Sequence, residues 1–325
     1  MKTALLLNII DPGIGGVLIK GEKGTAKSTT VRSLTQILPG IEYVKNCTYH
    51  CRPGRGRALC PDCADLVASG TTIEYETAQM KVVELPLSAT EDRIAGTLDI
   101  EHMLQSGKKR FEPGVLAQAN GNLLYIDEVN LLEDHMVDLL LDVAAMGINY
   151  VEREGISFEH PSRFILVGSM NPEEGELRPQ LLDRFGLCVS MTGEKYLSVR
   201  TEIVSRRLEF DSDPEAFTDK YAEDTNDIKE SILKARDILP NVVVSKEMLT
   251  AASDVCLHFK MEGHRADITM VRAARAYAAL HRKKRIDRTD LEAVAPLVLD
   301  HRIKRKPFEN SKFDIEELRK CLQGY

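Results

Sequence analysis

The fold class predicted by the sequence is α/β: a domain built on a parallel sheet, followed by an all-helical domain. Up to about residue 193, short apolar runs alternate with helical patterns, which is typical of a parallel sheet buried on both faces. From residue 194 onward only helical patterns follow. We therefore expect two domains, at residues 1–193 and 194–325.

Composition and charge narrow the class of protein. The 325 residues are 43% hydrophobic and 29% charged, which is ordinary for a globular protein with its own core. No apolar run reaches the roughly 18 residues of a membrane span, and the N-terminus turns polar too soon for a secretory signal, so we expect a cytoplasmic protein. The net charge of -7 argues against general nucleic-acid binding, although a local basic channel would be compatible with it.

Four strands and one helix define the first domain. The apolar runs at residues 16–20, 123–126, 164–167 and 187–191 have the length of buried strands. Residues 28–38 share an apolar face at helical spacing and stop at Pro39-Gly40. Because ligands of a parallel sheet bind beyond the carboxyl ends of its strands, we expect the polar residues at these ends to form the site.

Two insertions into this domain are expected to form hairpins. Residues 94–113 resemble two strands with a short helix at 101–106, and residues 149–158 alternate like two strands joined near 153–155. Such a hairpin can act as a lever, grip a partner or merely stabilise an edge, and the pattern alone favours none of these.

Helical patterns make up the second domain, at residues 196–208, 228–239, 245–259, 269–281 and 287–299. Ser245 and Asp287 are suited to cap two of these helices at their N-termini. The acidic stretch at 211–227, which contains Pro214, is predicted to be a loop or a helix interrupted by one.

A glycine-rich loop follows the first strand and opens the first helix, which is the context of a phosphate-binding loop. It consists of Gly21, Glu22, Lys23, Gly24, Thr25, Ala26, Lys27, Ser28 and Thr29. Backbone N–H groups and the helix N-terminus would hold the phosphates of ATP, Lys27 would contact the β- and γ-phosphates, and Ser28 would ligate Mg²⁺. Ala26 stands where the strict pattern has glycine, and we expect right-handed geometry there because this position begins the helix.

Polar residues after two later strands would complete an ATP-hydrolysing site. Asp127 is suited to hold Mg²⁺, and Glu128 is suited to polarise the attacking water. Asn171 could orient this water or sense the γ-phosphate, although asparagine before proline is also a common turn residue.

Three arginines are candidates to contact the γ-phosphate, because arginine offers a fixed charge and planar donors. Arg184 could reach the phosphate bound by a neighbouring subunit, or it could instead pair with Asp183 or Glu176. Arg178 is a second candidate for this role. Arg265 could act from the helical domain, although its spacing alone favours a surface arginine.

Four of the seven cysteines gather in an insertion at residues 45–66. Cys47, Cys51, Cys60 and Cys63 are separated by three, eight and two residues, so they could bind Zn²⁺ or an iron–sulfur cluster. Free thiols or a redox-switchable pair are the alternatives. The remaining cysteines are isolated and are expected to be small buried side chains: Cys188, Cys256 and Cys321.

Several longer runs are shared with a known family. They are AKS at residues 26–28, LPLSATEDR at 85–93, DEVNLL at 127–132, VEREG at 151–155, EGELRPQLLDRF at 174–185 and RKPFE at 305–309. In these runs, which span nearly the whole chain, the sequence resembles the ATPase (I) subunit of magnesium chelatase. That family belongs to the AAA+ ATPases with a helix-2 insertion, which also include MoxR ATPases and minichromosome maintenance helicases.

The resemblance implies an assembly and roles for individual residues. It implies a hexameric ring with ATP between subunits, Asn171 as sensor 1, Arg184 as arginine finger and Arg265 as sensor 2. Residues 92–111 would be the helix-2 insertion, and the hairpin around Arg153 would precede sensor 1. The implied partners are an AAA-like subunit with an integrin-type domain and a large tetrapyrrole-binding subunit that inserts Mg²⁺ into protoporphyrin IX.

Other functions would use the same nucleotide chemistry. One alternative is a MoxR-like chaperone that remodels a metalloprotein, and another is the motor of a cobalt or nickel chelatase. The runs at 151–155 and 305–309 favour a chelatase over the chaperone. A nucleic-acid translocase would need basic surfaces such as residues 108–110 and 281–285, but the net charge argues against it. The family usually has a Gly-Gln motif before the first helix that helps to hold adenine. Here Met1 lies within the equivalent of that helix, so we expect either a less complete adenine pocket or a misassigned start.

Overall fold

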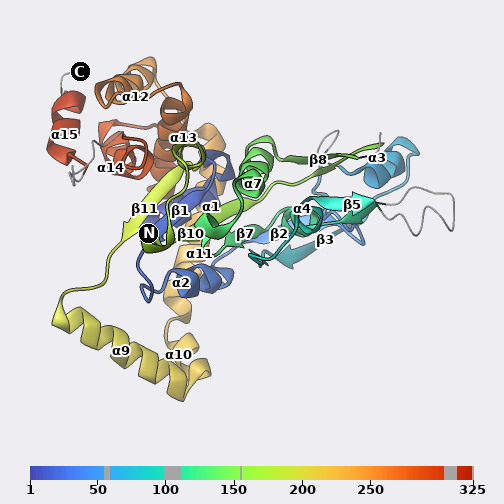
Figure 1. The fold of residues 1–325 in the computed structure, drawn as a ribbon, viewed down its shortest axis with the longest axis horizontal. Helices are drawn as coiled ribbons and strands as arrows, with labels where there is room; N and C mark the ends of the chain where they lie inside the picture. Colours follow the sequence, from blue (N-terminus) through green and yellow to red (C-terminus); the bar gives the residue numbers. More distant parts are fainter. Residues whose placement is uncertain (55–58, 99–110, 154–155, 304–312, 324–325) are drawn as a thin grey trace.

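A parallel sheet of five strands lies at the centre of the computed structural model (Figure 1). The structure describes residues 1–325 except 55–58, 99–110, 154–155, 304–312 and 324–325. The strands are β1 (Val17–Gly21), β4 (Val82–Leu85), β7 (Leu123–Ile126), β10 (Ile165–Met170) and β11 (Leu187–Met191). Their order is β11-β1-β10-β7-β4 and every pair is parallel, which confirms the predicted fold class. The four predicted strands are present, whereas β4 was not predicted.

Alternate residues of the strands face two different hydrophobic cores. Val17 and Ile19 of β1 contribute to the core shared with the C-terminal helices, whereas Leu18 contributes to a core on the other face. The same alternation holds in β7 and β10, as expected for a strand period of two. The sheet is thus buried on both faces, which explains why its strands are almost entirely apolar.

Helices of the first part cover the two faces. They are α1 (Lys2–Ile10), α2 (Lys27–Ser33), α4 (Glu91–Ala95), α6 (Val115–Ala119), α7 (Asp134–Met146) and α8 (Pro179–Arg184). The helix predicted at 28–38 is shorter, because α2 ends at Ser33 and a 3₁₀ turn (Leu34–Gln36) follows. The helix α7 was not predicted.

Three antiparallel strand pairs extend from this body. They are β2 (Gly40–Val44) with β3 (Tyr75–Gln79), β5 (Gly96–Leu98) with β6 (Phe111–Pro113), and β8 (Ile148–Arg153) with β9 (Ile156–Pro161). The last two pairs confirm the strands of the predicted hairpins, while the helix predicted at 101–106 lies outside the described residues. The β2–β3 pair brackets the cysteine-rich insertion, which contains α3 (Pro61–Ala68).

The C-terminal part is helical, as predicted. Its helices are α9 (Leu197–Ser212), α10 (Pro214–Lys220), α11 (Ala222–Ile238), α12 (Lys246–His258), α13 (Arg265–Leu280), α14 (Arg288–Leu299) and α15 (Ile315–Gln323). Ser245 and Asp287 accept hydrogen bonds from backbone N–H groups at the starts of α12 and α14, so both predicted caps are confirmed. The stretch at 211–227 is an interrupted helix, with breaks at Asp213 and Tyr221.

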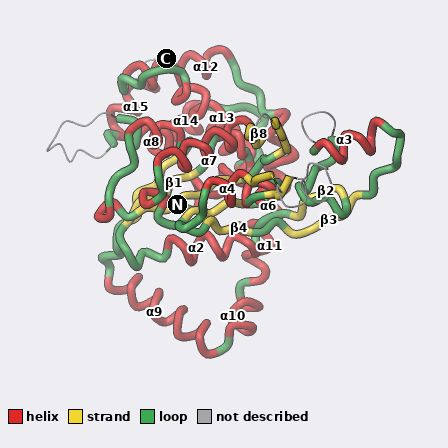
Figure 2. Tube along the Cα trace, turned by 45° about the vertical axis from the view of Figure 1, so that its right-hand side comes forward, coloured by secondary structure: helices red, strands yellow, loops and turns green. Residues whose placement is uncertain are grey.

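Two features of the C-terminal part affect how the chain is divided. The helices α9 and α10 project from the body as an arm (Figures 1 and 2), and α9 has no buried residue. The first helix, α1, packs against α11 and α13, so the N-terminus shares a core with the C-terminal helices. Among the described residues, no helix is both long and apolar enough to cross a membrane.

Candidate functional site

The predicted phosphate loop, acids and sensor residue meet in one pocket at the carboxyl ends of β1, β7 and β10. The pocket has a volume of about 260 Å³. It is lined by Lys23, Gly24, Thr25, Ala26, Lys27, Ser28, Thr29, Asp127, Glu128 and Asn171. Residues from three separate strand ends thus converge where a parallel sheet places its ligand.

The side chain of Lys27 folds back onto the phosphate loop. Its Nζ donates hydrogen bonds to the backbone carbonyls of Gly21 and Glu22. The Thr25 hydroxyl donates to the Glu22 carbonyl at 2.8 Å, which tightens the same turn. The first two loop residues therefore act through their carbonyls, while the rest of the loop lines the pocket.

Ala26 corrects one expectation from the sequence. Its φ of 59° and ψ of 25° are left-handed rather than right-handed, although it directly precedes α2. Glu128 is also left-handed, with φ 54° and ψ 52°. Each such residue costs about 1–2 kcal/mol relative to right-handed geometry. Two strained residues thus line the same small pocket, a distribution that is typical of functional sites.

Asp127 lies within a network of hydroxyl groups. Its Oδ2 accepts a hydrogen bond from the Ser28 hydroxyl at 3.0 Å, and its Oδ1 accepts from Tyr125 at 2.8 Å and from Ser169. Burial alone would raise the pKa of Asp127, but these three donors outweigh burial, and the pKa is lowered. The carboxylate is therefore held ionised and directed towards Ser28.

Ser169 and Tyr125 were not among the predicted site residues. Tyr125 lies two residues before Asp127 on β7, so the two side chains project to the same side of the strand. The Ser169 hydroxyl also accepts from the Glu128 backbone N–H at 3.2 Å, which supports the left-handed turn. Polar residues within otherwise apolar strands were the signal that could have revealed both.

Asn171 caps a turn and also lies at the pocket. Its Oδ1 accepts from the Glu173 N–H at 3.3 Å and so caps the turn after β10. The residue is only 3% exposed and also lines the pocket. Since Oδ1 is bound to the turn, Nδ2 is the group available to donate into the pocket.

Arg184 and Arg178 lie outside this pocket and pair with acids of α7. The guanidinium of Arg184 pairs with Asp142 and, at 3.3 Å, with Asp138. Arg178 pairs with Asp134 at 2.5 Å. The alternative partners suggested for Arg184, Asp183 and Glu176, were therefore wrong, because α7 brings a row of acids spaced four residues apart along this side of α8.

Arg265 also lies outside the pocket and pairs with Asp183 at 2.8 Å. The same carboxylate binds Arg302 at 3.1 Å, and Arg302 donates further to the carbonyls of Asp183, Phe185 and Gly186. The guanidinium side chain of Arg302 is only 3% exposed. Arg302, which was not a predicted site residue, therefore fastens the C-terminal helices to the end of α8.

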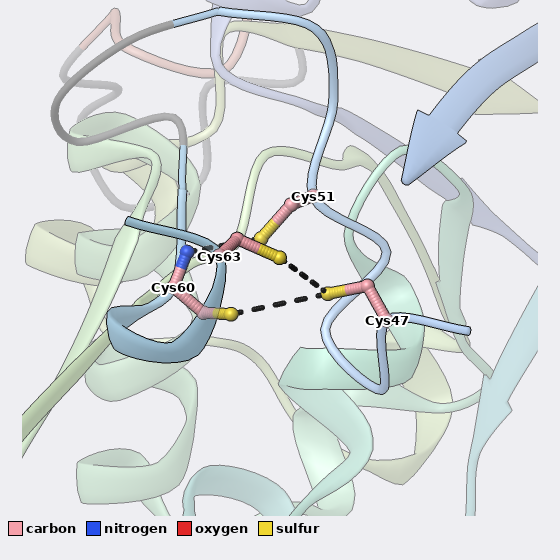
Figure 3. Close-up of side chains that lie close together, drawn as sticks. All are labelled: Cys47, Cys51, Cys60 and Cys63. Carbon is pink, nitrogen blue, oxygen red and sulfur yellow. Dashed lines mark hydrogen bonds between the residues drawn. The ribbon is translucent and has the colours of Figure 1, made fainter. Parts of the chain in front are cut away.

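The sulfur atoms of Cys47, Cys51, Cys60 and Cys63 converge on one point (Figure 3). All four atoms lie within 4.8 Å of one another. Cys47 accepts hydrogen bonds from the thiols of Cys51 and Cys60, which lowers its pKa. Donation to Cys47 raises the pKa of Cys51 and of Cys60, and burial raises the pKa of Cys63. All seven cysteines of the chain lie in the described part, and all are free.

The basic run at 281–285 is partly neutralised. Lys283 pairs with Asp287 at 2.9 Å and with the buried Asp290 at 2.7 Å. The run at 108–110 lies outside the described residues. The described part of the candidate basic surface is therefore weaker than its sequence suggested.

Comparison with known proteins agrees with the fold. One family model described as AAA domain (dynein-related subfamily) matches residues 66–185, and another described as AAA lid domain matches residues 249–321. A chain from a structure of the complex between subunits BchI and BchD of magnesium chelatase is 43% identical, with a TM-score of 0.51, over 99% of this chain and 95% of that chain. A putative ATPase from Cytophaga hutchinsonii, 16% identical with a TM-score of 0.63, shares the fold.

Curated relatives match along the whole chain. The magnesium-chelatase subunit ChlI homolog of Methanocaldococcus jannaschii is 50% identical over 100% of this chain and 88% of the relative. The magnesium-chelatase 38 kDa subunit of Acidiphilium rubrum is 49% identical over 96% of this chain and 90% of the relative. The chain therefore belongs to the magnesium-chelatase I-subunit family of AAA ATPases.

Proposed function

We propose that this chain is the ATP-hydrolysing motor subunit of a tetrapyrrole metal chelatase. One observation carries the proposal: the phosphate loop, Asp127, Glu128 and Asn171 line a single pocket in a chain that matches magnesium-chelatase subunits along its whole length. The pocket supplies phosphate binding, an ionised carboxylate and a candidate base, which together are the requirements for cleaving ATP.

The loop and the network around Asp127 would bind the nucleotide. Backbone N–H groups at the start of α2 would hold the phosphates, and Lys27 would exchange its loop carbonyls for phosphate oxygens. The Ser28 hydroxyl and Asp127 already lie in contact, so both oxygens are positioned to hold the Mg²⁺ of Mg-ATP. When bound, this ion would neutralise charge that develops on the phosphates.

Two other residues would act on the attacking water. Glu128 would accept its proton, and Nδ2 of Asn171 would donate a hydrogen bond that orients the water or the γ-phosphate. The left-handed backbone at Glu128, supported by Ser169, would hold the carboxylate in the pocket rather than along the strand.

We further propose that the active form is a hexameric ring. Arg184 lies outside its own chain's pocket but is held by α7, which would suit an arginine presented to the ATP of a neighbouring subunit. Arg265 would act as sensor 2 from α13 after leaving Asp183. The exposed apolar residues of the arm would offer a contact surface between subunits, among them Leu197, Ile203, Val204 and Leu208.

The ring would work in the cytoplasm with two other proteins. The complex between subunits BchI and BchD of magnesium chelatase supports a second chelatase subunit as partner. The resemblance to the family implies that this subunit carries an integrin-type domain. A large subunit would bind protoporphyrin IX and insert Mg²⁺, driven by ATP turnover in this chain. Insertion of cobalt or nickel, or remodelling of a metalloprotein, would use the same pocket with different partners.

A trapping experiment tests this proposal. The Glu128→Gln variant should bind ATP without hydrolysing it, so with ATP it should retain its partners in a pull-down from its native cytoplasm. Lys27→Ala, which should not bind ATP, is the matched control. Recovery of an integrin-domain subunit and a large tetrapyrrole-binding subunit with the first variant alone would support the chelatase. Recovery of unrelated clients only would contradict the chelatase, and retained turnover in Glu128→Gln would contradict the assigned base.

A further inference from the structure

We propose that Cys47, Cys51, Cys60 and Cys63 form a tetrahedral zinc site that holds two hairpins of the α/β part in place. Three of the cysteines lie between β2 and α3 and Cys63 lies in the first turn of α3, away from the residues that line the ATP pocket. The cluster is therefore a second site, independent of the proposed motor function.

The sulfur positions match the ligand shell of one zinc ion. Four thiolates about 2.3 Å from zinc stand about 3.8 Å from one another at the corners of a tetrahedron. The Sγ atom of Cys47 lies 3.9 Å from that of Cys60 and 3.5 Å from that of Cys63, and no pair of the four exceeds 4.8 Å. Figure 3 shows all four side chains directed towards a common centre.

The distances between the sulfur atoms favour a single metal ion over an iron–sulfur cluster or a pair of disulfides. In an iron–sulfur cluster the four thiolates are distributed over two or four irons, so the four sulfur atoms as a set would be spread more widely than the 4.8 Å found here. A disulfide would select one partner for each cysteine, whereas Cys47 is similarly close to Cys60 and Cys63. Tetrahedral sites of four thiolates are typical of zinc or of iron–sulfur centres, and the close spacing of the sulfur atoms favours a single zinc ion here.

The backbone around the cysteines is already ordered for binding. The loop from Val44 to Cys51 is closed by a hydrogen bond from the Val44 N–H to the Cys51 carbonyl at 2.7 Å. Asn46 and His50, the residues that precede the first two cysteines, are both left-handed, which turns the chain sharply at each ligand. The Cys60 N–H points at the Cys51 sulfur, 2.9 Å away, as expected for stabilisation of a thiolate.

A zinc ion at this position would stabilise the two hairpins through a chain of aromatic rings. Tyr49, between the first two cysteines, packs against Phe158 of β9 with ring centroids 5.7 Å apart. Phe158 in turn stacks on Phe111 of β6 at 4.2 Å. Three of the cysteines belong to the same small hydrophobic core as these strands. Because sulfur fills all four positions, the ion would be structural rather than catalytic.

Metal analysis of the purified full-length chain tests the site. Inductively coupled plasma mass spectrometry should find about one zinc per wild-type chain, and Cys60→Ser should lose it. Cys321→Ser is the matched control, because Cys321 lies outside the cluster and bonds only to Asp254 among the contacts described. The control should retain its zinc.

Two measurements on the wild-type chain keep the test decisive if Cys60→Ser fails to fold. Cobalt substitution should give the visible spectrum of a tetrahedral tetrathiolate site. Removal of zinc by a chelator should speed amide hydrogen exchange in β5–β6 and β8–β9 more than in β1 and β10. Iron in place of zinc, a metal-free chain with no cobalt spectrum, or zinc retained in Cys60→Ser would overturn the proposal. None of these readouts depends on ATP turnover.

Discussion

Replacing Arg184 with alanine is expected to abolish ATP turnover while hardly changing stability. In the structure Arg184 and Arg178 lie at the two ends of α8, and each pairs with an acid of α7. The Arg178→Ala variant is therefore a closely matched control. If Arg184 alone serves the neighbouring site, the control should retain its turnover.

In Arg184→Ala, the expected loss of ATP turnover is much larger than the expected loss of folding stability. The side chain of Arg184 is 30% exposed, and its acid partners are about half exposed, so the ion pairs should contribute about 0.2–1 kcal/mol to folding. An arginine that acts on the γ-phosphate contributes about 10³- to 10⁵-fold in kcat, which corresponds to about 4–7 kcal/mol of transition-state stabilisation. The loss in turnover should thus exceed the loss in stability several-fold.

Three assays separate these effects: steady-state ATP hydrolysis, binding of a fluorescent ATP analogue and unfolding by denaturant. Nucleotide binding should be unchanged in Arg184→Ala. Mixing this variant with Lys27→Ala in equal amounts should restore some turnover, because a randomly mixed ring would combine an intact loop with an intact arginine at about a quarter of its interfaces.

Several results would refute the reasoning. Turnover in Arg184→Ala within about tenfold of wild type would exclude a direct role at the γ-phosphate. Equal losses in both arginine variants would indicate that α7–α8 packing, rather than one guanidinium, is responsible. No restoration in any mixture would contradict a site shared between subunits.

Three further outcomes are expected. Ser169→Ala removes a buried hydroxyl donor to Asp127 and should lower the free energy of unfolding by about 1–3 kcal/mol in a denaturant titration. Ser162→Ala, which removes a buried hydroxyl outside the pocket, should have a similar effect on stability, but only the Ser169 variant should need more Mg²⁺ for half-maximal turnover. Ala26→Gly removes the strain of the left-handed backbone at this residue, but glycine also increases the entropy of the unfolded chain. The net effect should be a rise of up to about 1 kcal/mol in the free energy of unfolding. A decrease would show that Ala26 is not strained. The pKa of Asp127 is lowered in the folded chain, so its ionised form stabilises the fold above the ordinary carboxyl pKa, and this contribution is lost as the pH falls through the folded pKa. Asp127→Asn should therefore flatten the dependence of the free energy of unfolding on pH in this acidic range. Denaturant unfolding at a series of pH values measures this effect.

Local patterns in the sequence were sufficient to predict the sheet and the pocket. The strands that carry Asp127 and Asn171 are buried on both faces, so continuous apolar runs reveal them, and polar residues at their ends must converge. The edge strand β4 was missed because it is only partly buried and contains Glu84, which pairs with Arg32. An edge strand of this kind lacks the apolar signal of a buried one.

Contacts between distant segments could not be predicted in the same way. The acids that hold Arg184 lie about forty residues earlier in the chain, on a helix that was not recognised, so only tertiary packing reveals the pairing. The handedness of Ala26 was mispredicted because Ala26 was placed in the first turn of the helix, whereas it is the N-cap residue before α2. The closure of the loop onto Lys27 constrains the backbone angles of Ala26 instead.

The contacts of Arg302 have a mechanical consequence. Along the chain, the C-terminal helices are connected to the sheet only through the exposed arm. In space, Arg302 links the same helices directly to the backbone carbonyls of Asp183 and Phe185. Those two residues flank Arg184 on either side. A displacement of the C-terminal helices would therefore act on the segment from Asp183 to Phe185 before it extends the arm. A tilt of the C-terminal helices would thus reach Arg184 through Arg302 and Asp183, without passing along the arm.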